Sequence, residues 1–211
     1  IAEAHDMSFT VHLPLDLVLA SGDLVARESS LELAKRVIAA GRVLDPWGYV
    51  VHVEHGDVWP GSWDQWERLA GAALSQLVQF VGDASLLCLE NIESVPPEPV
   101  FAVARRLRTG ICLDVGHLVK TRRNPLPELE RVLPQTRIIH LHGWDGEHDH
   151  RSLDVMPTGE LLPIVERLRR SEFAGVVTLE VFSEDDWLSS TARLQHVLEL
   201  GSSDGIDVQA R

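Results

Sequence analysis

The sequence has little positive charge. Lysine and arginine together number 19 against 32 aspartates and glutamates, which gives 211 residues a formal net charge of -13. A nucleic-acid surface needs a basic face to neutralise phosphates, so this balance argues against a nucleic-acid partner. One basic cluster is present, at Lys120, Arg122 and Arg123. A single loop does not form a DNA-binding stripe, and we expect these side chains either to be solvated or to contact one small anionic group.

Cysteine and long apolar runs are also scarce. The two cysteines, Cys88 and Cys112, lie in apolar stretches, so the sequence predicts no disulfide framework and fits a reducing cytoplasm. No apolar run reaches the length that spans a bilayer. We therefore predict a cytoplasmic protein without a membrane partner. Its oligomeric state is not predictable from the sequence.

Six short apolar runs alternate with segments of helical periodicity. Runs such as Leu86-Leu-Cys-Leu89 are nearly continuous in apolar residues, which is typical of a parallel sheet covered by helices. A doubly wound sheet would normally carry a Gly-rich phosphate turn after an early strand, and this chain has none. The pattern therefore favours an α/β fold of the (β/α)8 TIM-barrel type. The expected strands are 8–13, 49–52, 86–90, 111–114, 137–142 and 176–181, and the expected helices are 29–43, 63–81, 96–108, 126–133, 161–170 and 185–200.

We expect one TIM-barrel-like domain over residues 1–200, followed by a polar tail over residues 201–211. An apolar content of 45% is sufficient for a full core in a chain of this length. The chain opens Ile1-Ala-Glu-Ala-His5, which reads like the last turn of a helix. With six βα units visible, we expect the first two units of the barrel to be missing from this chain.

Each expected strand carries, at or near its end, a residue that can bind a metal. These residues are His12, His52, Glu90, Asp114, His140 and Glu180. The side chain two residues earlier shares the same face of each strand, because the strand period is two. Those partners are mostly small or β-branched, as a barrel interior requires: Thr10, Val50, Cys88, Cys112, Ile138 and Thr178. We therefore expect the six polar groups to point inward at the carboxyl end of the strands, where barrel active sites lie.

These strand ends predict a metal site. One inward histidine is more often a satisfied core residue than a ligand, and one inward carboxylate can pair with an arginine. The six strand-end residues include no lysine or arginine that could neutralise the three carboxylates. Clustered carboxylates repel and raise one another's pKa. A bound divalent cation resolves this. Asp114 and His117, separated by Val115 and a glycine expected to supply a turn, offer oxygen and nitrogen ligands suited to zinc, manganese or iron.

The pattern of these motifs resembles the xylose-isomerase-like, or endonuclease-IV-like, TIM-barrel superfamily. Within that superfamily, the closest resemblance is to cobamide-remodelling phosphodiesterases. The stretches that carry it are Val11-His-Leu-Pro-Leu-Asp-Leu17, Leu89-Glu-Asn-Ile92, Cys112-Leu-Asp-Val-Gly-His117, Ile139-His-Leu-His-Gly143 and Leu179-Glu-Val-Phe-Ser183.

The resemblance implies a ligand set and a catalytic set. It implies one or two divalent metal ions (zinc, manganese or iron), and catalytic roles for Glu90, Glu180 and His142. At one position the chain departs from the DNA-repair members of the superfamily, which carry an aspartate where this chain has His148, so we do not expect a full trinuclear site. The implied metal ligands are His12, His52, Glu90, Asp114, His117, His140, His150 and Glu180.

Two activities compete for this ligand set. The first is a metal-dependent phosphodiesterase that cuts the nucleotide loop of a cobamide to give cobinamide phosphate and a nucleoside. The alternative is a metal-dependent sugar or sugar-phosphate isomerase or epimerase, in which Glu90 and Glu180 shuttle a proton. The extra histidines His142, His148 and His150 favour the first, since they offer further ligands or phosphate contacts.

Two further alternatives remain. One is a binding module that has lost catalysis, and the other is repair of abasic DNA, which the acidic balance disfavours. Tryptophans in the loops either line a wide apolar mouth for a corrinoid or pack helices on the barrel: Trp47, Trp59, Trp63 and Trp144.

Overall fold

The structure is a computed structural model that describes residues 7–203. The chain forms two compact units. The first comprises the residues up to Leu113 together with Pro134–Ile138, and the second comprises Asp114–Leu133 and the chain from Ile139 onward. Two strands, β4 (Gly110–Asp114) and β5 (Thr136–Leu141), contribute residues to both units. His5 lies outside the described residues.

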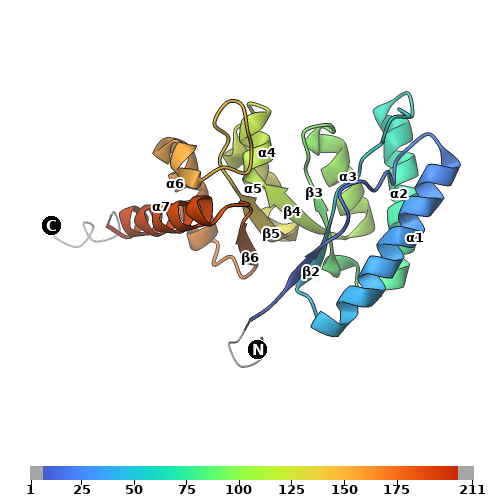
Figure 1. The fold of residues 1–211 in the computed structure, drawn as a ribbon, viewed down its shortest axis with the longest axis horizontal. Helices are drawn as coiled ribbons and strands as arrows, with labels where there is room; N and C mark the ends of the chain where they lie inside the picture. The colour runs from blue at the N-terminus through green and yellow to red at the C-terminus, as the bar shows by residue number, and fades with distance from the viewer. Residues whose placement is uncertain (1–6, 204–211) are drawn as a thin grey trace. The chain divides into compact units, whose positions relative to one another are not determined.

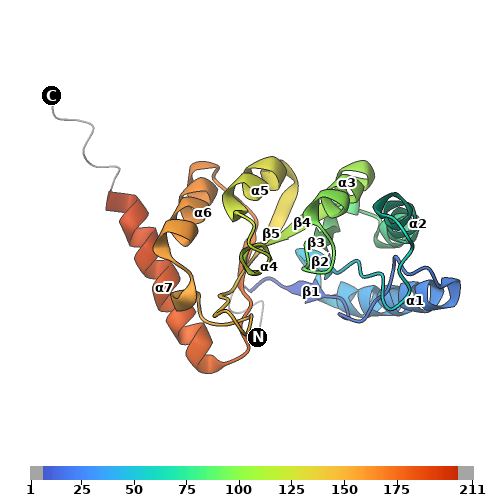
Figure 2. The same cartoon turned by 90° about the horizontal axis from the view of Figure 1, so that it is seen from above.

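The first unit holds parallel strands covered by three helices (Figures 1 and 2). Its strands follow the chain order, and β1 pairs with β2, β2 with β3 and β3 with β4, all in parallel. The predicted parallel sheet is therefore confirmed. Its other elements are β1 (Thr10–His12), α1 (Leu24–Gly41), η2 (Arg42–Leu44), β2 (Gly48–Val51), α2 (Trp63–Val81), η3 (Ala84–Leu86), β3 (Leu87–Glu90) and α3 (Pro97–Leu107).

The side chains inside this unit are those that the two-residue period of the strands predicts. Val50, Cys88, Cys112 and Ile138 form a cluster in which no side chain is more than 1% exposed. Each lies two positions before one of the strand-end polar groups. Because side chains alternate along a strand, this cluster places the polar residues at the strand ends on the same face.

Helix α2 has the bounds predicted for it, whereas α1 does not. Ser62 caps α2 by accepting a hydrogen bond from the backbone of Gln65 (3.2 Å), and Gly82 ends it with a φ of 95°. The prediction that the first helix begins near residue 29 is wrong. Asp23 accepts from the backbone of Val25 (2.8 Å) and starts α1 five residues earlier.

The second unit contains the end of β5 next to β6, where the amide of Glu180 donates to the carbonyl of Leu141 (3.0 Å). Helices α6 and α7 pack against each other, and α7 also packs against β6 (Figure 1). Its elements are α4 (Val115–Lys120), α5 (Pro125–Val132), η5 (Leu153–Val155), α6 (Thr158–Arg170), β6 (Val176–Leu179) and α7 (Glu184–Ser203); η4 (Leu133–Gln135) begins in this unit.

The second unit corrects three expectations. Helix α4 follows β4 directly and was not predicted as a separate helix. Helix α6 begins at Thr158 rather than 161, and α7 continues to Ser203 where a tail was expected from residue 201. Residues 204–211 of the expected tail lie outside the described residues. Across residues 7–203, every helix is too short or too polar to span a bilayer.

Candidate metal-binding and catalytic residues

The ends of the strands position the predicted ligands. His12, Glu90 and Asp114 are the last residues of β1, β3 and β4, and His140 is the last but one of β5. His52, His142 and Glu180 lie one residue beyond β2, β5 and β6, so the predicted strands were too long by one or two residues at these ends. Strand pairing ends at these residues, because the chain leaves the sheet there.

In the first unit, two histidines converge on Glu90. The Nε2 atoms of His12 and His52 lie 3.2 and 3.0 Å from Oε2 of Glu90, and the two imidazole rings meet edge to face at 4.9 Å. Glu90 is fully buried. These three residues bring ligand atoms within 4.8 Å of one another, which is a spacing that one metal ion can bridge.

The second unit holds a group of two carboxylates and an imidazole. One ligand atom each from Asp114, His140 and Glu180 lies within 4.8 Å of the others. His140 Nδ1 lies 2.9 Å from Glu180 Oε2 and 3.8 Å from Asp114 Oδ2. Asp114 is fully buried, whereas the Glu180 side chain is 19% exposed, so Glu180 is the carboxylate residue of this group that is open in part to solvent.

A second group in this unit consists of three histidines, His117, His142 and His150. One nitrogen from each lies within 4.8 Å of the others. The rings of His142 and His150 are stacked at 4.2 Å, and His117 meets them edge to face at 5.2 and 5.8 Å. The Nε2 of His142 lies 3.2 Å from Oδ1 of Asp114, so this group adjoins the Asp114 carboxylate.

The short helix α4 fixes the position of His117. Asp114 caps this helix by accepting a hydrogen bond from the backbone of His117 (2.6 Å). Gly116 was expected to supply a turn, but it lies inside the helix. A Cβ at this position would lie 2.2 Å from the His142 ring, so the glycine makes room for that imidazole.

Hydrogen bonding in the first unit fits a bound cation. The Nδ1 of His12 lies 2.7 Å from the carbonyl oxygen of Leu13, and a carbonyl only accepts, so Nδ1 carries the proton. The neutral ring then presents the Nε2 lone pair to Glu90, whose carboxylate also accepts only. Two acceptors 3.2 Å apart need a cation between them, either a proton or a metal ion.

Hydrogen bonding in the second unit fits a cation as well. Within the described residues, the buried Glu180 Oε2 and His142 Nε2 lack a hydrogen bond of ordinary geometry, although His140 and Asp114 lie close to them. The donors are imidazoles and carboxylates, which suit zinc, manganese or iron. The residues therefore fit the metal that the sequence predicts.

Electrostatics agree with this arrangement. The pKa of His142 is raised: burial lowers it, but the adjacent Asp114 carboxylate outweighs burial, with help from the Gly143 carbonyl and Glu180. The raised pKa shows that this point attracts positive charge. Asp149, next to His150, has a pKa of about 2, because the ion pair with Lys120 outweighs the burial of its carboxyl group.

Two sets of predicted residues do not join these groups. His148 was expected to add a ligand or a phosphate contact, but its side chain is 68% exposed and lies 3.9 Å from Asp145. Trp47 was expected near the mouth, but it lies at the start of β2, where its indole donates to the carbonyl of Arg137 (3.3 Å). Trp59 and Trp63 form an edge-to-face row that ends on the fully buried Trp66.

Comparisons with known proteins identify the fold. A family model described as "Xylose isomerase-like TIM barrel" matches residues 1–200. A solved D-tagatose 3-epimerase-like protein superposes with a TM-score of 0.83 at 22% identity, covering 96% of this chain and 81% of that chain. An L-ribulose 3-epimerase superposes with a TM-score of 0.76 at 16% identity, covering 99% and 81%.

A Thermus thermophilus protein whose crystals were soaked with zinc chloride gives a TM-score of 0.70 at 25% identity, covering 92% of this chain and 79% of that chain. No curated protein sequence matches. These comparisons confirm the predicted α/β fold of the TIM-barrel type.

Proposed function

Because this chain belongs to the xylose isomerase-like TIM barrel family, we propose that it is a divalent-metal-dependent enzyme that isomerises or epimerises a sugar. Two of the reported structures support this reading, since one is named a D-tagatose 3-epimerase-like protein and the other an L-ribulose 3-epimerase. The observation that carries the proposal is the partly exposed Glu180, whose carboxylate lies beside His140 in one group with the buried Asp114. Such a carboxylate can remove a proton from a carbon next to a carbonyl.

In this proposal the residues of the second unit have different roles. Asp114, His140 and Glu180 would hold the metal ion, which would polarise the oxygen of the substrate carbonyl. His140, 2.9 Å away, fixes the Glu180 carboxylate that takes the proton. His142 lies beside the other oxygen of Asp114, with its Nε2 3.2 Å from Oδ1.

The sequence pattern assigns the second half of the proton shuttle to Glu90. Two carboxylates are needed if the proton is to leave one face of the carbon and return on the other. His12 and His52 both hold one oxygen of Glu90, so its carboxylate is fixed in direction. This role for Glu90 rests on the strand-end pattern.

A phosphodiesterase acting on a cobamide is the second candidate. The histidine group His117, His142 and His150 favours it, because a single-metal epimerase does not need a second set of nitrogen ligands. In this reading His117 and His150 would hold a second cation, which would stabilise the charge on the leaving oxygen. The cobamide as substrate rests on the sequence resemblance alone.

Deuterium exchange separates the two candidates. The metal-loaded chain is incubated with a panel of ketoses in D2O, and incorporation of deuterium next to the carbonyl is followed by NMR. We expect incorporation with at least one ketose, and its loss in Glu180→Gln and in Glu90→Gln. Glu130→Gln, the same change at an exposed glutamate of α5, serves as the matched control.

A parallel incubation with an adenosylated cobamide tests the second candidate. Release of cobinamide phosphate without exchange in any ketose would replace the epimerase proposal with the phosphodiesterase. A purified chain that binds no divalent metal would overturn both.

A further inference from the structure

A pocket of about 550 Å³ lies in the second unit beside the loop that follows α4. It is lined by the end of α4 with its loop, the first residues of α5, the stretch after β5 and the first turns of α6. Its lining includes two arginines and a tryptophan, and none of these has a role in the proposed metal chemistry. The residues that matter here are Val119, Arg122, Arg123, Asn124, Trp144 and Glu160.

Arg122 supplies the available positive charge of this pocket. Of the three cations in the basic cluster, Lys120 pairs with Asp149, and Arg123 lies 3.5 Å from Glu128. The guanidinium of Arg122 is exposed and pairs with no group of the described residues. A charge that is not neutralised locally can bind an anion from solution, in a chain whose net charge is otherwise strongly negative.

The backbone holds Arg122 in place. Helix α4 ends in a pattern where the amide of Arg122 donates to Val119 (2.9 Å) and the amide of Arg123 donates to Leu118 (2.8 Å). Arg122 has a φ of 60° at the position that this type of helix end usually gives to glycine. Arg122 therefore occupies a position whose backbone conformation would suit glycine better.

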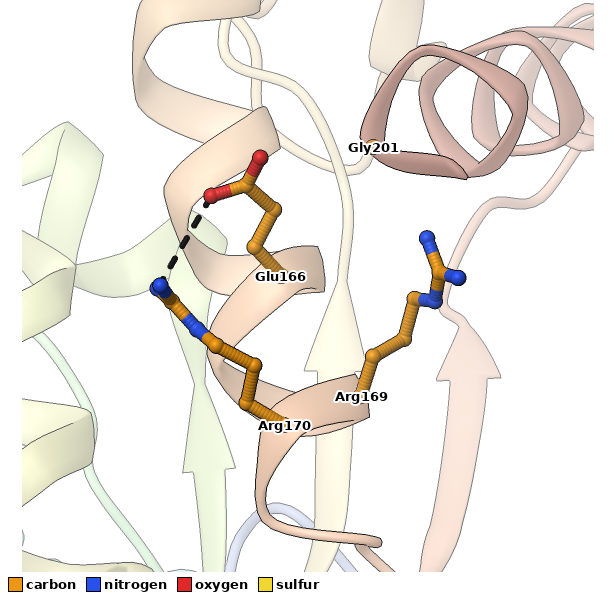
Figure 3. Close-up of a pocket in the computed structure, with 4 residues that line it drawn as sticks. All are labelled: Glu166, Arg169, Arg170 and Gly201. Atoms are coloured by element: carbon orange, nitrogen blue, oxygen red, sulfur yellow. Dashed lines mark ion pairs between the residues drawn. The ribbon is translucent and has the colours of Figure 1, made fainter. Parts of the chain in front are cut away.

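The arginines of α6 present a contrast. In the groove between α6 and α7, Arg170 pairs with Glu166 (3.8 Å; Figure 3). Arg169 donates to the carbonyl of Leu198 (3.3 Å). Both guanidinium groups there already have partners, so that groove offers no comparable charge. Arg170 therefore serves as a matched control for Arg122.

The residues of the pocket lie close in sequence to those of the candidate site. Arg122 follows His117 by five residues on the same short helix and its end, and Trp144 follows His142 by two. Trp144 is half-buried and gives the pocket an apolar wall next to its cations. An apolar wall with a few placed polar groups is typical of small-molecule sites.

We propose that this pocket binds the phosphate group of a phosphorylated sugar, with Arg122 as the main contact and Trp144 as the apolar wall. Arginine suits phosphate because its planar guanidinium donates two parallel hydrogen bonds. Glu160 lies on the rim with its carboxylate exposed and opposes the anion. The sugar part of this proposal rests on the proposed function, whereas the phosphate site does not.

Calorimetric titration of the full chain with inorganic phosphate tests the phosphate site. We expect Arg122→Gly to weaken binding at least about tenfold, because a charge-assisted hydrogen bond is lost. Glycine suits the backbone at this position, so the variant should keep its fold. Glu160→Gln should bind phosphate more tightly than the parent, and Arg170→Ala and His140→Ala should bind it as the parent does.

Three results would overturn the phosphate site. They are no measurable binding by the parent chain, equal affinity of the parent and Arg122→Gly, and loss of binding in His140→Ala alone, which would place the anion at the metal ligands.

The substrate arm compares a ketose with its phosphate ester in the exchange assay. Arg122→Gly should raise KM for the phosphorylated ketose only and leave kcat unchanged, and an equal change for both sugars would contradict the assignment. If neither sugar exchanges deuterium, the proposed function fails. The phosphate titration still shows whether the pocket binds phosphate.

Discussion

The Nδ1 atom of His150 lies 3.0 Å from the main-chain carbonyl oxygen of Glu180. Because a carbonyl only accepts, Nδ1 carries the proton and Nε2 keeps its lone pair for a ligand. The Glu180 side chain is 4.0 Å from the same nitrogen, so the main chain after β6 orients the ring. The carboxylate of Glu180 serves one ligand group and its carbonyl orients a histidine of the other.

Glu180→Gln should therefore lower metal content without abolishing it. The variant loses a carboxylate from the group with Asp114 and His140, while the carbonyl that orients His150 is unchanged. Loss of a residue that only hydrogen-bonds to a metal ligand typically weakens metal binding about 10–100-fold. Loss of the Glu180 carboxylate itself should therefore remove the metal from its group when parent and variant are compared at the same protein concentration. Zinc or manganese per chain is measured by mass spectrometry after dialysis.

His140→Ala should show the same partial loss, and His148→Ala should show none, because His148 is exposed and lies outside both groups. Complete loss of metal in Glu180→Gln would show that the two groups are not independent.

Gly116→Ala should destabilise the second unit. A Cβ at this position lies 2.2 Å from the His142 ring, so the ring must leave its place beside Asp114. Overpacking of this kind costs about 1–3 kcal/mol. The free energy of unfolding is measured by urea denaturation, and metal content by the assay above.

Gly159→Ala is the matched control for this change. It lies in helix α6, and an added Cβ meets nothing within 4 Å. Alanine there should stabilise the chain by about 0.5–1 kcal/mol, since glycine weakens a helix. A neutral effect at residue 116 would contradict the role assigned to its glycine.

The sequence predicted the fold well where local chemistry and burial agree. Helix α2 has the bounds expected from the sequence, and in the structure Ser62 caps its start and Gly82 follows its last residue. Helix α1 was misplaced because its first turns, around Arg27 and Glu28, carry no apolar period. Only the structure shows that Asp23 caps it. Local signals at a helix start do not reveal which of several polar residues forms the cap.

The candidate site was predicted in composition but not in its internal arrangement. Strand period places His12 and Glu90 on one face, because alternation is a local property. It does not say that His12 and His52 share one oxygen of Glu90, nor that Gly116 makes room for His142. Those relations join residues far apart in the chain, so no local pattern contains them.

Ile138→Ala should destabilise the first unit strongly. Ile138 is fully buried in the cluster with Val50 and the two cysteines, and removal of its branched side chain leaves a cavity. Such truncations cost about 2–5 kcal/mol. Val43→Ala, at a side chain that is 83% exposed, should change stability by less than about 0.5 kcal/mol. Equal effects in chemical denaturation would contradict the assigned core.

Asp186→Ala should loosen the start of α7 in a pH-dependent way. The Asp186 carboxylate accepts hydrogen bonds from the Ser183 hydroxyl (2.7 Å) and the Ser152 amide (3.0 Å), while the Ser183 hydroxyl accepts from the Asp186 amide (3.0 Å). Loss of a cap of this kind costs about 0.5–2 kcal/mol. Asp185→Ala, an exposed neighbour in the same turn, is the control.

The hydrogen bond from Ser183 is the main cause that lowers the pKa of Asp186. The contribution of the ionised Asp186 carboxylate to the free energy of unfolding is therefore fully present above the unfolded pKa of about 3.9. It is lost as pH falls through the lower pKa of the folded state. The difference in unfolding free energy between the parent and Asp186→Ala should be constant near neutral pH and shrink in acid. A difference that grows as pH falls would show that the carboxylate does not stabilise this helix end in its ionised form.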